Sequence, residues 1–194
     1  MLDYEKRFEH EVLAGIDEAG RGPLAGPVVC ACVIMPLDED KIIEGINDSK
    51  KLTAKKREIL YDKIINTALC YKIVEIDEKT IDEINILNAT KLGMKRALEG
   101  LTQMPDRVLI DAVKIDTMIK QENIVKGDAL SYNIASASIL AKVYRDRLME
   151  KLDEVYPQYG FKKHKGYGTK MHIEALKKYG ESSIHRQTFI KHFK

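Results

Sequence analysis

Residues 11–35, EVLAGIDEAGRGPLAGPVVCACVIM, contain the pattern that decides the fold. The first six residues are mostly apolar and strand-forming, and they end abruptly at Asp17 and Glu18. Such a run predicts a buried strand that delivers two carboxylates to its end. A turn rich in Gly and Pro follows, and residues 28–35 form a second apolar run. We therefore expect the two strands to form a hairpin.

Further along the chain, helical and strand-like patterns alternate. Strands followed by alternating helices and strands favour an α/β fold, with a mixed sheet that is antiparallel at first and parallel later. Because no linker, repeat or low-complexity segment interrupts the pattern, we expect residues 1–194 to form a single domain. The expected strands span residues 71–76, 107–110 and 123–125, and the expected helices span residues 54–66, 88–101, 131–152 and 171–178.

Acidic residues follow several of the strand-like runs. Asp17 and Glu18 end the first run, Asp111 ends the run at 107–110, and Asp128 follows the expected strand near residue 124. A single acid after a strand is commonly only a turn residue. Adjacent acids at the end of a buried strand, however, cost stability unless a cation offsets them. Clustered carboxylates suit Mg²⁺ or Mn²⁺, which can assist phosphodiester cleavage without a protein nucleophile.

Two features indicate a polyanionic substrate. In the turn formed by Gly20, Arg21 and Gly22, glycine lets backbone amides approach a ligand closely, and arginine adds a forked donor for phosphate. Basic residues gather at 50–57 and 162–165, although the formal net charge is only +2. Such clusters can follow a phosphate backbone, but each alone is more often a solvated surface.

Six ordered segments of the sequence resemble bacterial ribonuclease HII, and the likeness runs from about Val12 to His185. The segments are GIDEAGRGPLAGPVV at 15–29, NDSKKLT at 47–53, LID at 109–111, KGD at 126–128, ASASILAKVYRDRLM at 135–149 and HKGYGT at 164–169. The resemblance implies a ribonuclease H-like fold, a mixed sheet of about five strands flanked by helices. It also implies a helical C-terminal extension, at about residues 155–194, that contributes to substrate binding.

The same resemblance implies an activity and a catalytic set. The activity is hydrolysis of the RNA strand of RNA–DNA hybrids, and of the bond on the 5′ side of single ribonucleotides in duplex DNA, leaving 3′-hydroxyl and 5′-phosphate ends. Asp17, Glu18, Asp111 and Asp128 would be both catalytic and metal-binding, with Mn²⁺ or Mg²⁺ as the cofactor. Two alternatives stay open: a DNA-directed nuclease of the same superfamily, and a non-catalytic module that binds hybrids.

The implied substrate contacts come from three places. The Gly-Arg-Gly turn would contact the backbone at the ribonucleotide and sense its 2′-hydroxyl, the group that separates RNA from DNA. Tyr167 would stack on the sugar of the following deoxynucleotide, where a ring disfavours an extra hydroxyl. Lys50 and Lys51, in the NDSKKLT segment, would contact the backbone.

Some positions depart from the family pattern or have no implied role. The family usually has glycine after its third acid, whereas here Ala112 follows Asp111, which brings Asp116 into consideration as a substitute. Asp146, between two arginines, is expected to be a structural ion-pair partner. Three histidines lack partners at metal-binding spacing, and we expect them in loops or on the surface: His164, His172 and His185.

Cysteine use and hydropathy bear on the compartment. The chain has 3 cysteines, an odd count without zinc-binding spacing, so we expect reduced thiols of a cytoplasmic protein. We find neither a signal peptide nor a long apolar run in the sequence and expect no membrane association. Since no heptad or apolar stripe requires a partner, we expect a monomer.

Overall fold

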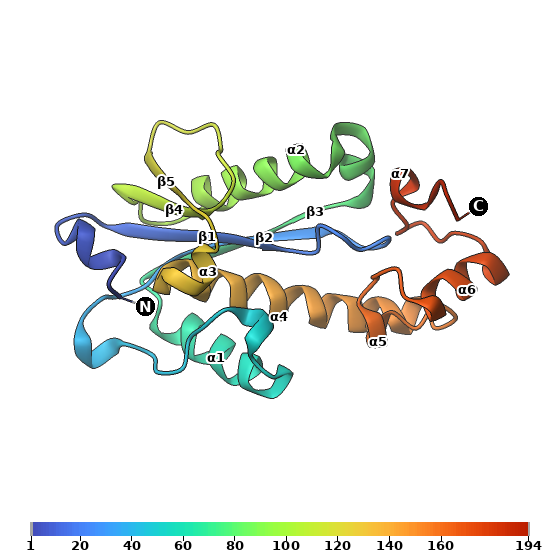
Figure 1. Cartoon of the computed structure of the whole chain (residues 1–194), viewed down its shortest axis with the longest axis horizontal. Helices are drawn as coiled ribbons and strands as arrows, with labels where there is room; N and C mark the ends of the chain where they lie inside the picture. Colours follow the sequence, from blue (N-terminus) through green and yellow to red (C-terminus); the bar gives the residue numbers. More distant parts are fainter. Residues whose placement is uncertain (1, 194) are drawn as a thin grey trace.

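The computed structural model describes residues 2–193 and has a mixed five-stranded sheet at its centre (Figure 1). The strands are β1 (Leu13–Ala19), β2 (Val28–Ile34), β3 (Cys70–Ile76), β4 (Arg107–Asp111) and β5 (Lys120–Ile124). Their order is β3-β2-β1-β4-β5. Strand β2 is antiparallel to β1 and β3, whereas β4 is parallel to β1 and β5. The hairpin and the change from antiparallel to parallel pairing are therefore confirmed.

Helices cover both faces of the sheet and extend beyond one end of it (Figure 1). Helix α2 packs on one face, and α4 packs on the other with α1 outside it. The short α5, α6 and α7 form the expected C-terminal extension. The helices are α1 (Ala54–Thr67), α2 (Glu78–Glu99), α3 (Gly127–Leu130), α4 (Tyr132–Val155), α5 (Phe161–His164), α6 (Lys170–Tyr179) and α7 (Gln187–Ile190). Three 3-10 helices precede β3: η1 (Glu5–Phe8), η2 (Glu39–Lys41) and η3 (Ser49–Lys51).

Strand β2 is buried along its whole length because helices lie on both of its faces. Val29, Ala31 and Val33 join the cluster that includes side chains of α1 and α4, whereas Cys30 and Cys32 join the cluster that includes those of α2. This two-sided burial explains why the sequence is continuously apolar instead of alternating. The three cysteines are free and buried, as expected.

Close packing between β1 and α4 depends on a glycine. A Cβ atom on Gly15 would lie 2.2 Å from the carbonyl carbon of Asn133, at the start of α4. No side chain fits there, so the long helix can lie directly against the strand that carries the acids. Within residues 2–193, no helix is both long enough and apolar enough to cross a membrane.

Several element boundaries differ from those expected, and two of the differences have a clear local cause. Helix α2 begins at Glu78, ten residues early, because Asp77 caps it by accepting a hydrogen bond from Thr80 N at 2.8 Å. Asn85, with φ 65°, interrupts the helix, and its side chain caps the second segment through Asn88 N at 3.1 Å. Strand β5 lies at 120–124 and not 123–125, since its polar side chains belong to an edge strand and leave no apolar signal.

Candidate active site

Two neighbouring parallel strands bring three of the predicted acids to one edge of the sheet. Ile16 of β1 pairs with Ile110 of β4, and the next residues in each strand are Asp17 and Asp111. Glu18 follows on β1, the central strand of the sheet. Because parallel strands end on the same side, the register places these carboxylates together.

The fourth acid is delivered by the turn between β5 and α4. Lys126 adopts a left-handed conformation with φ 59°, and α3 begins at Gly127. The amide of Gly127 donates to Asp111 Oδ1 at 3.1 Å, which ties this turn to the end of β4. Asp128 comes next and is buried. Burial raises its pKa, and the negative charge of Asp48 raises it further.

The carboxylates at the end of β1 have an excess of negative charge around them. Burial raises the pKa of Asp17 well above its ordinary value, and the charges of Glu18 and Asp111 add to the effect. Burial also raises the pKa of Glu18, although Arg21, 3.6 Å away, partly offsets it. Such a set of oxygen ligands favours a bound cation.

Lys50 supplies positive charge at the rim of this group. Its ammonium lies 3.9 Å from Asp128 Oδ2, and its side chain is 82% exposed. Burial alone would lower the pKa of Lys50, but Asp128 and Asp17 raise it. Lys51 is exposed on the same short helix and is not among the residues that line the pocket. The structure thus brings one of the two predicted lysines to the acids.

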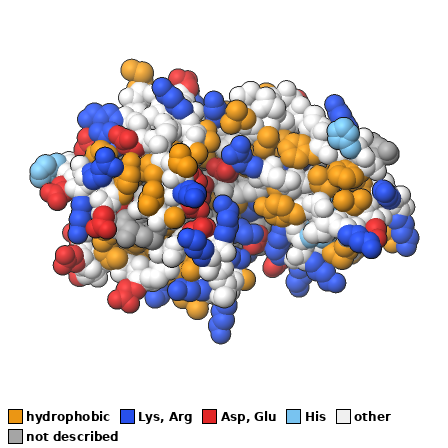
Figure 2. All heavy atoms as spheres, in the orientation of Figure 1, with side chains coloured by type: hydrophobic (Ala, Val, Ile, Leu, Met, Phe, Trp, Pro, Cys, Tyr) orange, Lys and Arg blue, Asp and Glu red, His pale blue; other side chains and the backbone are white. Residues whose placement is uncertain are grey.

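One pocket joins Asp17 and Glu18, but not Asp111 or Asp128, to most of the predicted substrate contacts. The predicted residues that line it are Asp17, Glu18, Gly20, Arg21, Gly22, Lys50 and Tyr167. Ser49, Ser138 and Lys142 also line it and were not predicted. A Cβ atom on Gly22 would lie 3.7 Å from the ring of Tyr167, so the turn and the ring face each other. In Figure 2, basic side chains surround acidic ones near the middle of the face shown.

Arg186, a residue that sequence reasoning missed, holds the Gly-Arg-Gly turn from inside the protein. Its fully buried guanidinium donates to Gly20 O at 2.6 Å, to Arg21 O at 2.8 Å and to Gly26 O at 2.7 and 2.9 Å. Burial and the nearby charge of Arg145 lower the pKa of Arg186 to about 9. These bonds fix the carbonyl groups and so direct the turn toward the pocket.

Arg145 is a second buried arginine, and it connects the turn to the loop that carries Tyr167. It donates to Ala25 O at 3.1 Å, Pro27 O at 2.9 Å and Lys165 O at 2.9 Å. Its side chain lies so close to Gly20, which has φ 96°, that a Cβ atom there would be 2.0 Å from Arg145 Nε. Glycine is required at this position for both reasons.

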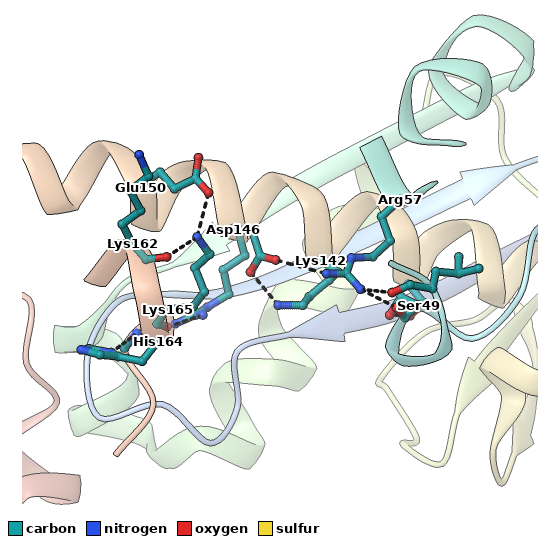
Figure 3. Close-up of polar contacts among 12 residues, drawn as sticks. Ser49, Arg57, Lys142, Asp146, Glu150, Lys162, His164 and Lys165 are labelled. Carbon is teal, nitrogen blue, oxygen red and sulfur yellow. Dashed lines mark hydrogen bonds and ion pairs between the residues drawn. The ribbon is translucent and has the colours of Figure 1, made fainter. Parts of the chain in front are cut away.

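A polar chain links α4 to the short helix that carries Lys50 (Figure 3). Lys142 Nζ lies 2.6 Å from Asp146 Oδ1, and Arg57 Nη2 lies 3.9 Å from Asp146 Oδ2. Arg57 in turn donates to Ser49 O at 2.9 Å. The prediction that Asp146 is a structural ion-pair partner is confirmed. Burial lowers the pKa of Lys142, which Asp146 partly offsets.

The expectation that three histidines lie in loops or on the surface is wrong for His164 and His172, which lie in α5 and α6, whereas His185 does lie in a loop, the segment before α7, although it is buried. His164, His172 and His185 are 7%, 0% and 2% exposed and pack together behind Tyr167. The sequence showed only that they lack metal-binding spacing. Their burial follows from α5, α6 and the segment before α7 folding over one another, with Phe161 packed against all three rings.

The departure at Ala112 is visible in the backbone. Ala112 has φ 53°, the left-handed conformation that glycine adopts most easily and that costs other residues energy. The backbone at Ala112 therefore has the conformation expected for the glycine that the family usually has at this position. Asp116, considered as a substitute for Asp111, instead pairs with Lys95 at 2.9 Å and is exposed.

The acids form an open group in this structure. Among residues 2–193, no three His, Cys, Asp or Glu side chains are arranged to enclose a metal ion. The donors are nonetheless hard oxygens, and the carboxyl groups of Asp17, Glu18 and Asp128 have raised pKa values. Their chemistry fits a divalent ion that would draw the carboxylates together on binding.

Comparisons with known proteins identify the family to which the chain is similar. Residues 14–192 match the model of the family described as ribonuclease HII. The chain is 58% identical to ribonuclease HII of Acetivibrio thermocellus, over 100% of this chain and 76% of that protein. It is 56% identical to ribonuclease HII of Caldicellulosiruptor bescii, over 94% and 88% of the two chains.

Solved structures show the same fold. The crystal structure of ribonuclease H2 from Pyrococcus horikoshii superposes with a TM-score of 0.73 at 30% identity, over 91% of this chain and 92% of that one. Ribonuclease HII of Archaeoglobus fulgidus, solved in complex with PCNA, gives 0.77 at 26% identity, over 94% and 96% of the two chains. Sequence and structure agree along nearly the whole length, and the chain therefore belongs to the ribonuclease HII family.

Proposed function

We propose that this chain is an endoribonuclease that hydrolyses the RNA strand of RNA–DNA hybrids and the bond on the 5′ side of single ribonucleotides in duplex DNA. The products would carry 3′-hydroxyl and 5′-phosphate ends. Membership of the ribonuclease HII family supports the reaction. The observation that carries the proposal is one pocket in which Asp17 and Glu18 face the Gly-Arg-Gly turn and Tyr167.

The family depends on divalent metal ions, and we assign the ligands in this chain to Asp17, Glu18, Asp111 and Asp128. Support comes from their oxygen donors, from the raised pKa values of Asp17, Glu18 and Asp128, and from the place of Asp111 beside Asp17 at the ends of two paired strands. Mn²⁺ or Mg²⁺ would supply positive charge to the scissile phosphate and activate water for attack. Either ion matches hard oxygen ligands.

The remaining residues would bind and orient the nucleic acid. Backbone groups of the Gly-Arg-Gly turn, fixed by Arg186, would meet the 2′-hydroxyl, a group that both donates and accepts hydrogen bonds. Tyr167 would pack on the next sugar and disfavour a hydroxyl there. Lys50 and Lys142 line the pocket and would contact phosphates, and Lys51 would contact the backbone outside it.

The assembly and setting are also part of the proposal. We expect one domain and a monomer, in which the C-terminal part at 155–194 helps to bind substrate through Tyr167. The partners would be RNA–DNA hybrids and duplex DNA that contains ribonucleotides. Three free, buried thiols are compatible with a reducing cytoplasm.

The test is a labelled DNA duplex that contains one ribonucleotide, incubated with Mn²⁺ or with Mg²⁺. We expect a single cut on the 5′ side of the ribonucleotide, while an all-DNA duplex of the same sequence stays intact. Cleavage of the all-DNA duplex would identify a DNA-directed nuclease instead. Binding without a cut under both metals would identify a non-catalytic module. Asp17→Asn should bind the duplex and not cut it.

A further inference from the structure

The loop that presents Tyr167 has little regular structure of its own. Lys165 and Gly166 both have positive φ, 53° and 85°, and Tyr167 is 44% exposed. Glycine at 166 and 168 leaves this backbone free to adopt other conformations. Its position in the fold therefore depends on hydrogen bonds from buried groups. The carbonyl of Tyr167 itself accepts from Thr169 N at 2.8 Å and lies 3.0 Å from His172 Nδ1.

The hydrogen-bond partners of His172 determine which of its nitrogen atoms carries the proton. A carbonyl oxygen only accepts, so Nδ1 must donate to Tyr167 O, and Nε2 of the neutral ring is then an acceptor. His185 Nε2 lies 3.0 Å from His172 Nε2. Its other nitrogen, Nδ1, accepts from the backbone amide of Ser182 at 2.9 Å, so Nε2 of His185 is the donor. The bond to Tyr167 O at one end of this hydrogen-bond series and the bond from Ser182 N at the other end independently require the same tautomers.

His164 is fixed in the same way. Its Nδ1 accepts from the amide of Gly166 at 3.2 Å, and its Nε2 donates to Tyr159 O at 2.9 Å. The ring stacks on His172 with centroids 4.5 Å apart. All three rings are therefore neutral, and one added proton anywhere would turn an acceptor into a donor facing another donor.

The surroundings of the three rings favour the neutral forms. Burial lowers the pKa of each ring, and that of His185 falls to about 4. The charged groups that act on the rings are Asp153 on α4, Lys165 after α5 and Glu181 after α6. Asp153 and Glu181 favour protonation of His164 and His185 respectively, whereas Lys165, which Figure 3 shows bound to Glu150, opposes it. The effect of burial exceeds that of both acids.

We propose that His172 is a positioning residue for substrate selection: held as the Nδ1-protonated tautomer by His185, it fixes the Tyr167 carbonyl and thereby sets the ring against the sugar. This inference rests on the proposed role of Tyr167 at the junction between a ribonucleotide and a deoxynucleotide. It gives the three buried rings a role, although their hydrogen bonds go to Tyr159, Gly166, Tyr167 and Ser182 and not to the acids. Protonation of the three rings would release the loop.

The first test is independent of activity. In the full chain labelled with ¹⁵N-histidine, long-range proton–nitrogen spectra at pH 7 distinguish the two neutral tautomers and the cation. We expect His172 as the Nδ1–H form, and His164 and His185 as the Nε2–H form. A protonated ring at pH 7, or His172 as the Nε2–H form, would overturn the proposal.

The second test compares two substrates, a duplex with a single ribonucleotide and a continuous RNA–DNA hybrid. The measured quantity is kcat/KM on the single-ribonucleotide duplex divided by kcat/KM on the continuous hybrid. Effects on the metal chemistry that both substrates share cancel in this ratio. His172→Leu removes the donor and should lower the ratio about 10-fold, mainly through KM on the junction substrate, which corresponds to one hydrogen bond. His172→Asn, whose amide can donate from the place of Nδ1, should restore the ratio to within about 3-fold.

The control is the Tyr167→Ala background, in which His172→Leu should change the ratio no further. In the wild type, the ratio should stay unchanged just below pH 6.5 and fall as the pH approaches about 4, the lowered pKa of His185. A folded His172→Leu variant with an unchanged ratio, or one that lowers the ratio equally in the Tyr167→Ala background, would overturn the proposal. Failure of the wild type to cut either substrate would instead refute the proposed function.

Discussion

Replacing Arg186 by lysine tests whether the substrate-facing turn is held from inside the protein. The guanidinium makes four hydrogen bonds to three backbone carbonyls, at 2.6 to 2.9 Å. An ammonium group keeps the charge but lacks the planar fork and can reach at most part of this set. If two carbonyls lose their partners, at about 1–2 kcal/mol each, the free energy of unfolding falls by about 2–4 kcal/mol. For a chain of this size, the melting temperature would drop by roughly 4–16 °C.

The assay is urea and thermal unfolding of the metal-free protein, followed by cleavage of the single-ribonucleotide duplex. Arg147→Lys is the matched control. It is the same chemical change, but the Arg147 side chain is 43% exposed and pairs with Glu58 at the surface. That change should alter the unfolding free energy by no more than about 0.5 kcal/mol. In the Arg186→Lys variant we also expect weaker discrimination between ribonucleotide and all-DNA duplexes.

Two results would refute this reasoning. One is an Arg186→Lys variant as stable as the Arg147→Lys control, which would mean that hydrogen bonds from the guanidinium to the three carbonyl groups do not contribute to stability. The other is a destabilised variant that still discriminates ribonucleotides as well as the wild type when assayed well below its melting temperature. The second result would separate the stability of the turn from its role in recognition.

Three further substitutions test the site and its packing. Asp17→Asn should abolish cleavage and raise the melting temperature of the metal-free protein. The gain should grow as pH rises from 5 to 7, because the pKa of Asp17 is raised in the fold and its ionisation therefore destabilises the wild type. Added Mn²⁺ should then stabilise the wild type more than this variant in thermal unfolding. Ala112→Gly should raise the unfolding free energy in urea by about 0.3–1 kcal/mol, since it relieves the left-handed conformation. Gly15→Ala should lower it by at least about 1–3 kcal/mol, because the new methyl group would lie 2.2 Å from the backbone of Asn133.

The acidic half of the site could be predicted because its signals are local. Asp17 and Glu18 directly follow an apolar run, and Asp111 follows another, so each acid is marked by the strand that delivers it. Parallel pairing of those two strands then places the acids at one edge without further information. The same reasoning fails for β5, an edge strand with polar side chains, and for the start of α2, where one capping side chain decides the boundary.

The basic and histidine-rich half could not be predicted because its partners are distant in sequence. Arg186 bonds to Gly20, 166 residues earlier, and Arg145 bonds to Ala25, 120 residues earlier. Nothing near either arginine in the sequence marks it as buried, since arginine is ordinarily exposed. The three histidines illustrate the same limit, because what buries them is the packing of the chain end and not their spacing. Resemblance to a family identified the segments but not these contacts.

Under the proposed roles of these residues, the two halves separate catalysis from substrate selection. The acids belong to β1, β4 and the turn before α4, all within the layered body of the fold. The selecting groups depend instead on backbone contacts between the turn and the chain end: Leu24 N donates to Gly166 O at 2.8 Å, Gly26 N to Ile184 O at 2.9 Å, and Arg186 N to Leu24 O at 2.8 Å. Damage to these contacts should therefore relax discrimination between substrates before it removes cleavage, whereas loss of one acid should remove cleavage and leave binding intact.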